Sequence, residues 1–210
     1  VVDFVGAMQT VRRLKAQLEE LLGVPLETAA TAVPPGIIEG NVRCIANVVE
    51  GAGFEVIHVI DEPTAAASVL GIRDGAVVDV GGGTTGISIL KDGKVIFIAD
   101  EPTGGTHMTL VLAGYYGISI EEAEKLKTDK DRERDVFPII KPVVEKMASI
   151  VKGFLSGYEV DCVYVVGGAS CFSEFEHTFE KALGIKTVKT NDALLVTPLG
   201  IAWNASAGPV

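Results

Sequence analysis

The stretch VVDVGGGTTGISILKDGKVIFIAD, residues 77–100, decides the fold of this chain. Gly81, Gly83 and Gly86 match the G-x-G-x-x-G spacing of dinucleotide-binding loops, and an acid follows about twenty residues after the first strand, as it does in that motif. In a dinucleotide-binding unit the glycine loop must open a helix, because the helix N-terminus binds the pyrophosphate. The residues after the glycines therefore distinguish an NAD site from another phosphate-binding loop.

Those residues predict strands rather than a helix. Two apolar runs, ISIL at 87–90 and VIFI at 95–98, flank the sequence KDGK at 91–94. An Asp-Gly pair between β-branched apolar runs is a strong hairpin signal, and glycine with many β-branched residues disfavours a helix. The pattern predicts strand, glycine turn, strand, turn, strand, and it argues against an NAD site.

The composition indicates a globular protein that binds neither nucleic acid nor a membrane. The chain has 210 residues, of which 48% are hydrophobic and 22% charged, which suits a sizeable core. Its mean hydropathy of +0.36 comes from many short Val, Ile and Ala runs, as in buried parallel strands. No run reaches the roughly 18 apolar residues of a membrane helix. A net charge of −10 without a Lys/Arg cluster argues against nucleic acid and anionic membranes.

The cysteines and histidines carry no metal or disulfide pattern. Three cysteines and three isolated histidines are present, and no C-x-x-C occurs. This argues against a disulfide framework or a zinc site. With no visible signal peptide, a reducing cytoplasm is the expected compartment.

Helical and strand patterns alternate, which predicts the α/β class with mostly parallel strand pairing. Asn41 is a candidate helix cap, and the prolines 138 and 142 limit where the helix over 137–155 can begin. The charge run 129–135 is expected to be a solvated turn, and Pro198 to interrupt the last helix. Helices are expected over 11–22, 41–51, 63–70, 106–115, 121–127, 137–155, 172–183 and 193–205, and strands over 28–33, 56–60, 77–80, 87–90, 95–98, 163–166 and 185–189.

The first candidate site is DEPT at residues 61–64, directly after a buried strand. Ligands gather at the carboxyl ends of strands in open α/β sheets, and Glu62 would stand there at a helix N-terminus. The alternative is an acid of the first helical turn without a chemical role, since negative charge is favoured at that position.

The second candidate is DVGGGT at residues 79–84. Three successive glycines allow backbone N–H groups to form an anion-binding concavity, because no Cβ obstructs close approach and positive φ is allowed. Asp79 at the strand end is placed to hold Mg²⁺ through water, and Thr84 adds a hydroxyl donor. The alternative is a tight turn between two strands.

The third candidate is VYVVGGAS at residues 163–170, where a buried strand gives way to a diglycine and a small residue. A flat ring can lie against such a backbone. The alternative is an ordinary strand-to-helix turn. The order of the three motifs along the chain is more specific than any one of them.

That order resembles the actin-like ATPase superfamily, which includes actin, MreB, FtsA, DnaK-type chaperones and sugar kinases. VVDVGGGTTGISIL is similar to its second phosphate loop, IDEPTAAASVLG to its first connecting helix, VYVVGGAS to its adenosine motif and TPLGIAWNA to its second connecting helix. Within the superfamily, VVDFVGAMQTVRRLK and the long segments that begin at both DEPT sequences resemble the chaperone-like family of ethanolamine utilisation.

The resemblance implies an α/β actin-like ATPase (ribonuclease H-like) fold with two lobes. Residues 1–72 would form a partial first lobe, residues 73–190 the second lobe with the second phosphate loop and adenosine motif, and residues 191–210 a helix that returns to the first lobe. The family's first phosphate loop, an Asp-x-Gly-Thr strand hairpin, and a lysine that some members use nearby have no match in this sequence. The resemblance therefore implies that this chain alone binds ATP weakly and hydrolyses it little, and that the missing hairpin segment would restore binding.

The resemblance also implies a site for ATP or ADP with Mg²⁺, acting by positioning and charge neutralisation. Asp79 would hold the metal through water, and Glu62 would orient the attacking water. The β- and γ-phosphates would contact Gly81, Gly82, Gly83 and Thr84, with Gly104, Gly105 and Thr106 lining the phosphate side. The adenosine would lie beside Gly167, Gly168 and Ala169, and Glu124 and Lys127 would reach the adenine or ribose.

The family suggests a nucleotide-dependent chaperone or reactivating factor whose two lobes close around ATP and act on a protein client. The client would be an enzyme or microcompartment shell component of ethanolamine breakdown, so the protein is expected in the cytoplasm, with microcompartment association. A filament-forming or scaffold protein like MreB or FtsA is an alternative, although residues 205–210 are unsuited to an amphipathic membrane tail. A sugar kinase is a third, which would need a catalytic base such as Asp100 or Glu101.

Overall fold

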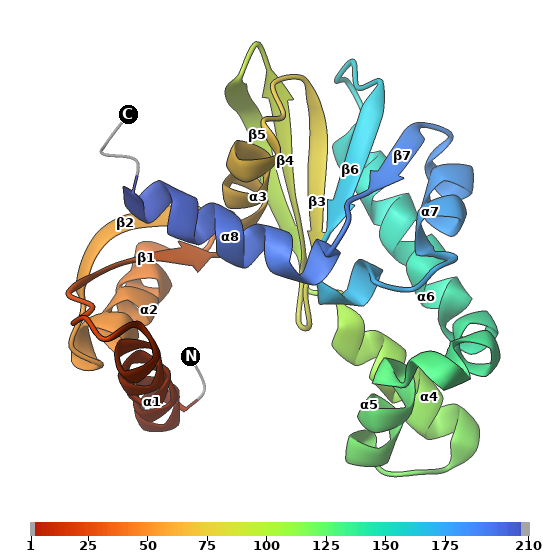
Figure 1. Cartoon of the computed structure of the whole chain (residues 1–210). Helices are drawn as coiled ribbons and strands as arrows, with labels where there is room; N and C mark the ends of the chain where they lie inside the picture. The colour runs from red at the N-terminus through yellow and green to blue at the C-terminus, as the bar shows by residue number, and fades with distance from the viewer. Residues whose placement is uncertain (1–2, 207–210) are drawn as a thin grey trace.

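The computed structural model describes residues 3–206, which form two β-sheets with helices around them (Figure 1). The elements are α1 Phe4–Leu22, β1 Thr28–Val33, α2 Glu39–Gly51, β2 Glu55–Asp61, α3 Glu62–Leu70, β3 Gly75–Val80, β4 Thr85–Lys91, β5 Lys94–Glu101, α4 Gly105–Tyr116, α5 Ile120–Thr128, α6 Glu133–Phe154, β6 Cys162–Val166, α7 Phe175–Leu183, β7 Lys186–Lys189 and α8 Ala193–Ser206, with short 3-10 helices η1 Lys130–Arg132 and η2 Gly168–Ser170.

The smaller sheet holds β1 and β2 in parallel, next to α1 and α2. Asp3 caps α1 by accepting a hydrogen bond from the Gly6 N–H, and Gly23 ends the helix in the left-handed region at φ 71°. Glycine adopts that conformation without steric cost, which explains why the apolar repeat stops there.

The larger sheet has the strand order β5-β4-β3-β6-β7. The strands β3, β4 and β5 are antiparallel neighbours, whereas β6 and β7 are parallel to β3. Asp92 and Gly93, between β4 and β5, both have positive φ, at 54° and 76°, as a type I′ hairpin turn requires. The predicted strand–glycine turn–strand–turn–strand unit is confirmed, and the glycine loop does not open a helix.

Helices cover both faces of the larger sheet, so β3 is buried throughout and β4 is buried except at its last residue, Lys91. Side chains of α4, α6 and α7 pack on one face, and those of α3 and α8 pack on the other. Within the part of the chain that the structure describes, no helix has both the length and the apolar character needed to cross a bilayer.

Four local predictions are wrong in whole or in part. Asn41 does not cap α2, because the helix begins at Glu39 and Ile38 occupies the N-cap position, which places Asn41 inside the first turn. The charge run 129–135 is solvated as expected, with every residue exposed except the partly buried Glu133, but it is not a turn: it forms η1 and the acidic first turn of α6, where negative charge is favoured. The prolines of α6 lie inside the helix, and Pro198 lies within an uninterrupted α8.

The helices α3 and α8 cross at very short range. A Cβ atom on Gly200 would lie 2.0 Å from the Ala65 carbonyl oxygen and 2.4 Å from its carbon. Asn204, one turn later on α8, donates to the Ser68 hydroxyl on α3 at 2.8 Å. In Figure 1 α8 runs from the larger sheet across to the smaller one. This crossing therefore fixes where α8 lies relative to both sheets.

We predict that Gly200→Ala destabilises the protein by about 1–3 kcal/mol or more, because the added methyl group forces two packed backbones apart. The matched control is Gly114→Ala on α4, where an added Cβ meets no atom within 4 Å. That change replaces a helical glycine in open space and is expected to stabilise by about 0.5–1 kcal/mol. Thermal unfolding of both variants measures the contrast, and similar melting temperatures for the two would contradict it.

Candidate functional site

The glycine loop between β3 and β4 packs against the N-terminus of α4. The Gly105 N–H bonds the Gly81 carbonyl at 2.9 Å, and the Thr106 N–H bonds the Gly82 carbonyl at 2.8 Å. A Cβ atom on Gly104 would lie 2.7 Å from the Gly82 oxygen and 2.8 Å from the Gly81 oxygen. A glycine at position 104 is therefore required for the start of α4 to approach the glycine loop, because any side chain there would collide with the loop backbone.

Turn geometry does not explain the glycines at positions 82 and 83. None of the three loop glycines has positive φ, so the expected left-handed conformation is wrong. A Cβ atom on Gly82 or Gly83 would meet nothing within 4 Å. A side chain would fit at either position in the ligand-free protein. Because both residues are glycines, the space stays open and leaves a cradle of backbone groups, as an anion-binding loop requires.

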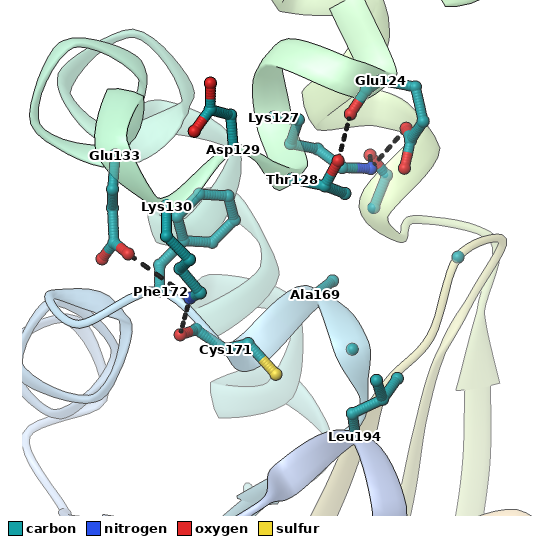
Figure 2. Close-up of a pocket in the computed structure, with 13 residues that line it drawn as sticks. Glu124, Lys127, Thr128, Asp129, Lys130, Glu133, Ala169, Cys171, Phe172 and Leu194 are labelled. Atoms are coloured by element: carbon teal, nitrogen blue, oxygen red, sulfur yellow. Dashed lines mark hydrogen bonds and ion pairs between the residues drawn. The ribbon is translucent and has the colours of Figure 1, made fainter.

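A cavity of about 400 Å³ opens beside this cradle (Figure 2). It brings together the glycine loop, the start of α4, α5, the start of α6 and the segment after β6. The residues around it are Gly82, Gly105, Glu124, Lys127, Thr128, Asp129, Lys130, Glu133, Gly168, Ala169, Cys171, Phe172 and Leu194. Its volume and mixed lining suit a small-molecule ligand of nucleotide size.

Lys127 holds α5 against the start of α4 at the edge of the cavity. Its Nζ atom donates to the Gly105 carbonyl at 3.1 Å, to the Thr109 hydroxyl at 2.9 Å and to Glu124 Oε2 at 2.7 Å. Burial acts to raise the pKa of Glu124, but the hydrogen bonds from Lys127 and Thr109 outweigh it and lower that pKa. Glu124 is thus a charged hydrogen-bond acceptor whose side chain is half exposed at the cavity. It is placed to accept hydrogen bonds from hydroxyl groups of a ligand.

The third motif contacts Asp79 directly. Gly167 has φ 89°, and a Cβ atom there would lie 2.4 Å from Asp79 Oδ1. A Cβ atom on Gly105 would lie 3.2 Å from the Ala169 methyl group, so the start of α4 and the third motif converge at the cavity. The apolar side of the cavity comes from Ala169, Phe172 and Leu194 (Figure 2). This surface is suited to a flat ring.

Sequence reasoning missed the part of the site that comes from η1 and α6. Lys130 donates to the Cys171 carbonyl at 3.0 Å and pairs with Glu133 at 3.4 Å, which ties η1 to the segment after β6. Glu133 also accepts from the Ser173 N–H. These residues belong to the charge run that was expected to be solvated, and charge alone gave no sign that they face a cavity.

Three carboxylates lie close together next to the glycine loop. Burial raises the pKa of Glu62 to about 7, helped by the negative charges of Asp79 and Asp100. Burial also raises the pKa of Asp79, while a hydrogen bond from Thr197 opposes it. Burial raises the pKa of Asp100 as well, against a hydrogen bond from Thr84. Each acid therefore resists ionisation, and a cation or a proton nearby would stabilise the group.

The donor set fits a nucleotide-bound magnesium ion rather than a protein-bound metal. Residues 3–206 contain no cluster of three or more His, Cys, Asp or Glu side chains arranged around a common metal position. Mg²⁺ is commonly held through one or two carboxylates, waters and substrate phosphates. Asp79, at the end of β3 beside the glycine cradle, suits that role.

The structure distributes the predicted site residues over two adjoining places. Gly82, Gly105, Glu124, Lys127, Gly168 and Ala169 line the cavity. The others do not line it: Glu62, Asp79 and Thr84 form the acidic end, while Gly81, Gly83, Gly104, Thr106 and Gly167 shape the loops between the two places.

We predict that Glu62→Gln stabilises the protein at pH 8 and leaves it unchanged at pH 4. The folded state holds the Glu62 proton more tightly than the unfolded chain, in which the pKa is 4.5. Stability is therefore lost as the pH rises from about 4.5 through about 7, and glutamine removes this loss. Each kcal/mol recovered would raise the melting temperature by about 2–4 °C.

Melting temperatures of the wild type, Glu62→Gln and the exposed α5 control Glu121→Gln at both pH values measure this effect. A difference between Glu62→Gln and the wild type that is equal at pH 4 and pH 8 would rule out the buried acid as its cause.

Comparisons with known proteins identify the family of this chain. Residues 67–195 match the family of the type IV pilus assembly protein PilM, and residues 1–129 match the MreB/Mbl protein family. The chaperone protein DnaK of Thermoplasma acidophilum is 29% identical over 133 residues, which is 58% of this chain and 22% of DnaK.

Matches over nearly the whole chain are found with ethanolamine utilization proteins. The ethanolamine utilization protein EutJ of Salmonella typhimurium is 43% identical over 208 residues, covering 99% of this chain and 73% of EutJ. The crystal structure of EutJ from Carboxydothermus hydrogenoformans superimposes with a TM-score of 0.91 at 51% identity, covering 96% of this chain and 75% of that one. The chain therefore belongs to the EutJ family of the actin-like ATPase superfamily.

Proposed function

We propose that this protein binds ATP with Mg²⁺ and acts as a nucleotide-dependent chaperone or reactivating factor in ethanolamine utilisation. The observation that carries the proposal is the open cradle at Gly82 and Gly83, which no turn requires and which adjoins a cavity of nucleotide size. Membership of the EutJ family and the likeness to DnaK support the role.

In this proposal the cradle binds the β- and γ-phosphates, and the cavity binds the nucleoside. Glu124 accepts hydrogen bonds from the ribose hydroxyl groups, and the apolar side formed by Ala169 and Phe172 packs against the adenine. Asp79 holds the waters of Mg²⁺, which neutralises phosphate charge when it is bound.

Glu62 would orient the water that attacks the γ-phosphate. Its pKa of about 7 means that the carboxylate form is partly populated at neutral pH, which is the condition for a group that accepts a proton during the reaction. ATP hydrolysis is therefore proposed to depend on Glu62, and ATP binding to depend on it much less.

The proposed client is an enzyme or a microcompartment shell protein of ethanolamine breakdown. The experiment mixes the full chain with purified proteins of that pathway, with ATP and without nucleotide, and measures which of them is retained. Retention that changes with nucleotide supports the proposal, and identical retention under both conditions contradicts it.

The match to the MreB/Mbl family favours one second candidate, an ATP-dependent filament or scaffold. Sedimentation and light scattering with and without ATP separate the two functions. A filament would pellet with ATP in the absence of any other protein, whereas a chaperone of single clients would stay in the supernatant.

We predict that Gly82→Ala lowers ATP affinity at least about tenfold, a loss of about 1.4 kcal/mol, while the melting temperature stays unchanged. The methyl group meets no atom of the protein but occupies the space proposed for phosphate oxygens. Titration calorimetry with Mg·ATP and thermal unfolding measure the two quantities. Gly114→Ala, remote from the cradle, is the control for affinity, and wild-type affinity in Gly82→Ala would refute the phosphate assignment.

A further inference from the structure

Asp79 receives a hydrogen bond from a residue far away in the sequence. The hydroxyl of Thr197, on α8, donates to Asp79 Oδ2 at 2.5 Å. Both side chains are buried, with 6% of Asp79 and 8% of Thr197 exposed. A buried hydrogen bond to a charged group is stronger than an exposed neutral one, because water does not compete for either partner.

The two oxygen atoms of Asp79 are thereby held in different ways. Oδ1 lies against the backbone at Gly167, where even a Cβ atom would be only 2.4 Å away, and Oδ2 accepts from Thr197. The carboxylate torsion of aspartate is intrinsically broad. These contacts narrow it to one orientation, which a group that binds a hydrated ion requires.

The position of α8 determines where this hydroxyl lies. The Ala193 carbonyl at the start of α8 accepts from the Gly167 N–H at 2.9 Å, and Gly200, three residues after Thr197, is pressed against the Ala65 carbonyl of α3. Thr197 is therefore fixed between a contact to the third motif and the crossing with α3. Its hydroxyl is presented to Asp79 by a helix packed on both sides.

We propose that Thr197 is a positioning residue for Asp79, and that Mg²⁺-dependent nucleotide binding depends on its hydroxyl group. The inference rests on the proposed function, because it assigns a role to Thr197 only if Asp79 acts on nucleotide-bound Mg²⁺. It places the orientation of that acid under the control of α8, and it adds a residue that lies in neither the glycine loop nor the cavity.

The test compares Thr197→Val, which has the same shape without the hydroxyl, with Thr197→Ser, which keeps it. MgCl₂ is titrated into the full chain with a fixed concentration of fluorescent ADP, and the Mg²⁺ midpoint of binding is measured. Loss of a group that orients a metal-binding side chain is expected to raise that midpoint about 10–100-fold in Thr197→Val. Thr197→Ser should stay near the wild type.

A double-mutant cycle with Asp79→Asn separates positioning from a general structural role. If Thr197 acts through Asp79, Thr197→Val raises the midpoint in the wild type and has no further effect in Asp79→Asn. An equal effect in both backgrounds, a wild-type midpoint in Thr197→Val, or failure of Thr197→Ser to preserve binding would each overturn the inference. Mg²⁺-independent ADP binding by the wild type would instead overturn the proposed role of Asp79, and the inference with it.

Discussion

The whole site depends on backbone segments that lie closer together than any side chain allows. Gly104 touches the backbone of Gly81, Gly82 and Gly83, Gly167 lies against Asp79, and Gly200 touches Ala65. At each contact an added Cβ atom would come within 2.8 Å of another heavy atom, which folded proteins do not tolerate without moving the backbone. Three segments distant in the sequence are thus brought to one place by packing.

Glycine has a second role in the same loop. At Gly82 and Gly83 the missing Cβ is not required by the neighbouring atoms, and it leaves free space instead. The two kinds of glycine, those that close contacts and those that keep a cradle open, are identical in the sequence. They differ only in the atoms that surround them. The structure therefore shows empty space beside Gly82 and Gly83, which the run of three glycines in the sequence does not reveal.

The acidic end of the site sets an electrostatic condition on any phosphate ligand. None of the ion pairs formed within residues 3–206 involves Glu62, Asp79 or Asp100. In addition, Asp100 Oδ1 is a buried oxygen without a hydrogen-bond partner among the described residues. A triphosphate would add like charge to this group, and its binding there is therefore coupled to that of a cation. By linkage the cation and the nucleotide must raise one another's affinity by the same factor.

Sequence rules that consider only neighbouring residues predicted the hairpin between β4 and β5 correctly, but they did not predict where α6 begins. Asp92 and Gly93 adopt the positive φ that their pairing predicts, because a two-residue turn is decided by its own residues. The start of α6 was predicted too late, because prolines are unfavourable inside a helix, whereas α6 begins at Glu133 and includes both Pro138 and Pro142. The cavity lining from η1 and α6 and the bond from Thr197 required the folded chain, since neither has a local sequence signal.

The contacts of α8 connect these observations physically. The helix meets α3 at Gly200, the third motif at Ala193 and Asp79 at Thr197, so three successive turns contact three different parts of the protein. A displacement of α8 toward α3 is blocked at Gly200, because backbone there already touches backbone. The same helix carries the contacts at Thr197 and at Ala193. A change in the position of α8 would therefore move the Thr197 hydroxyl relative to Asp79.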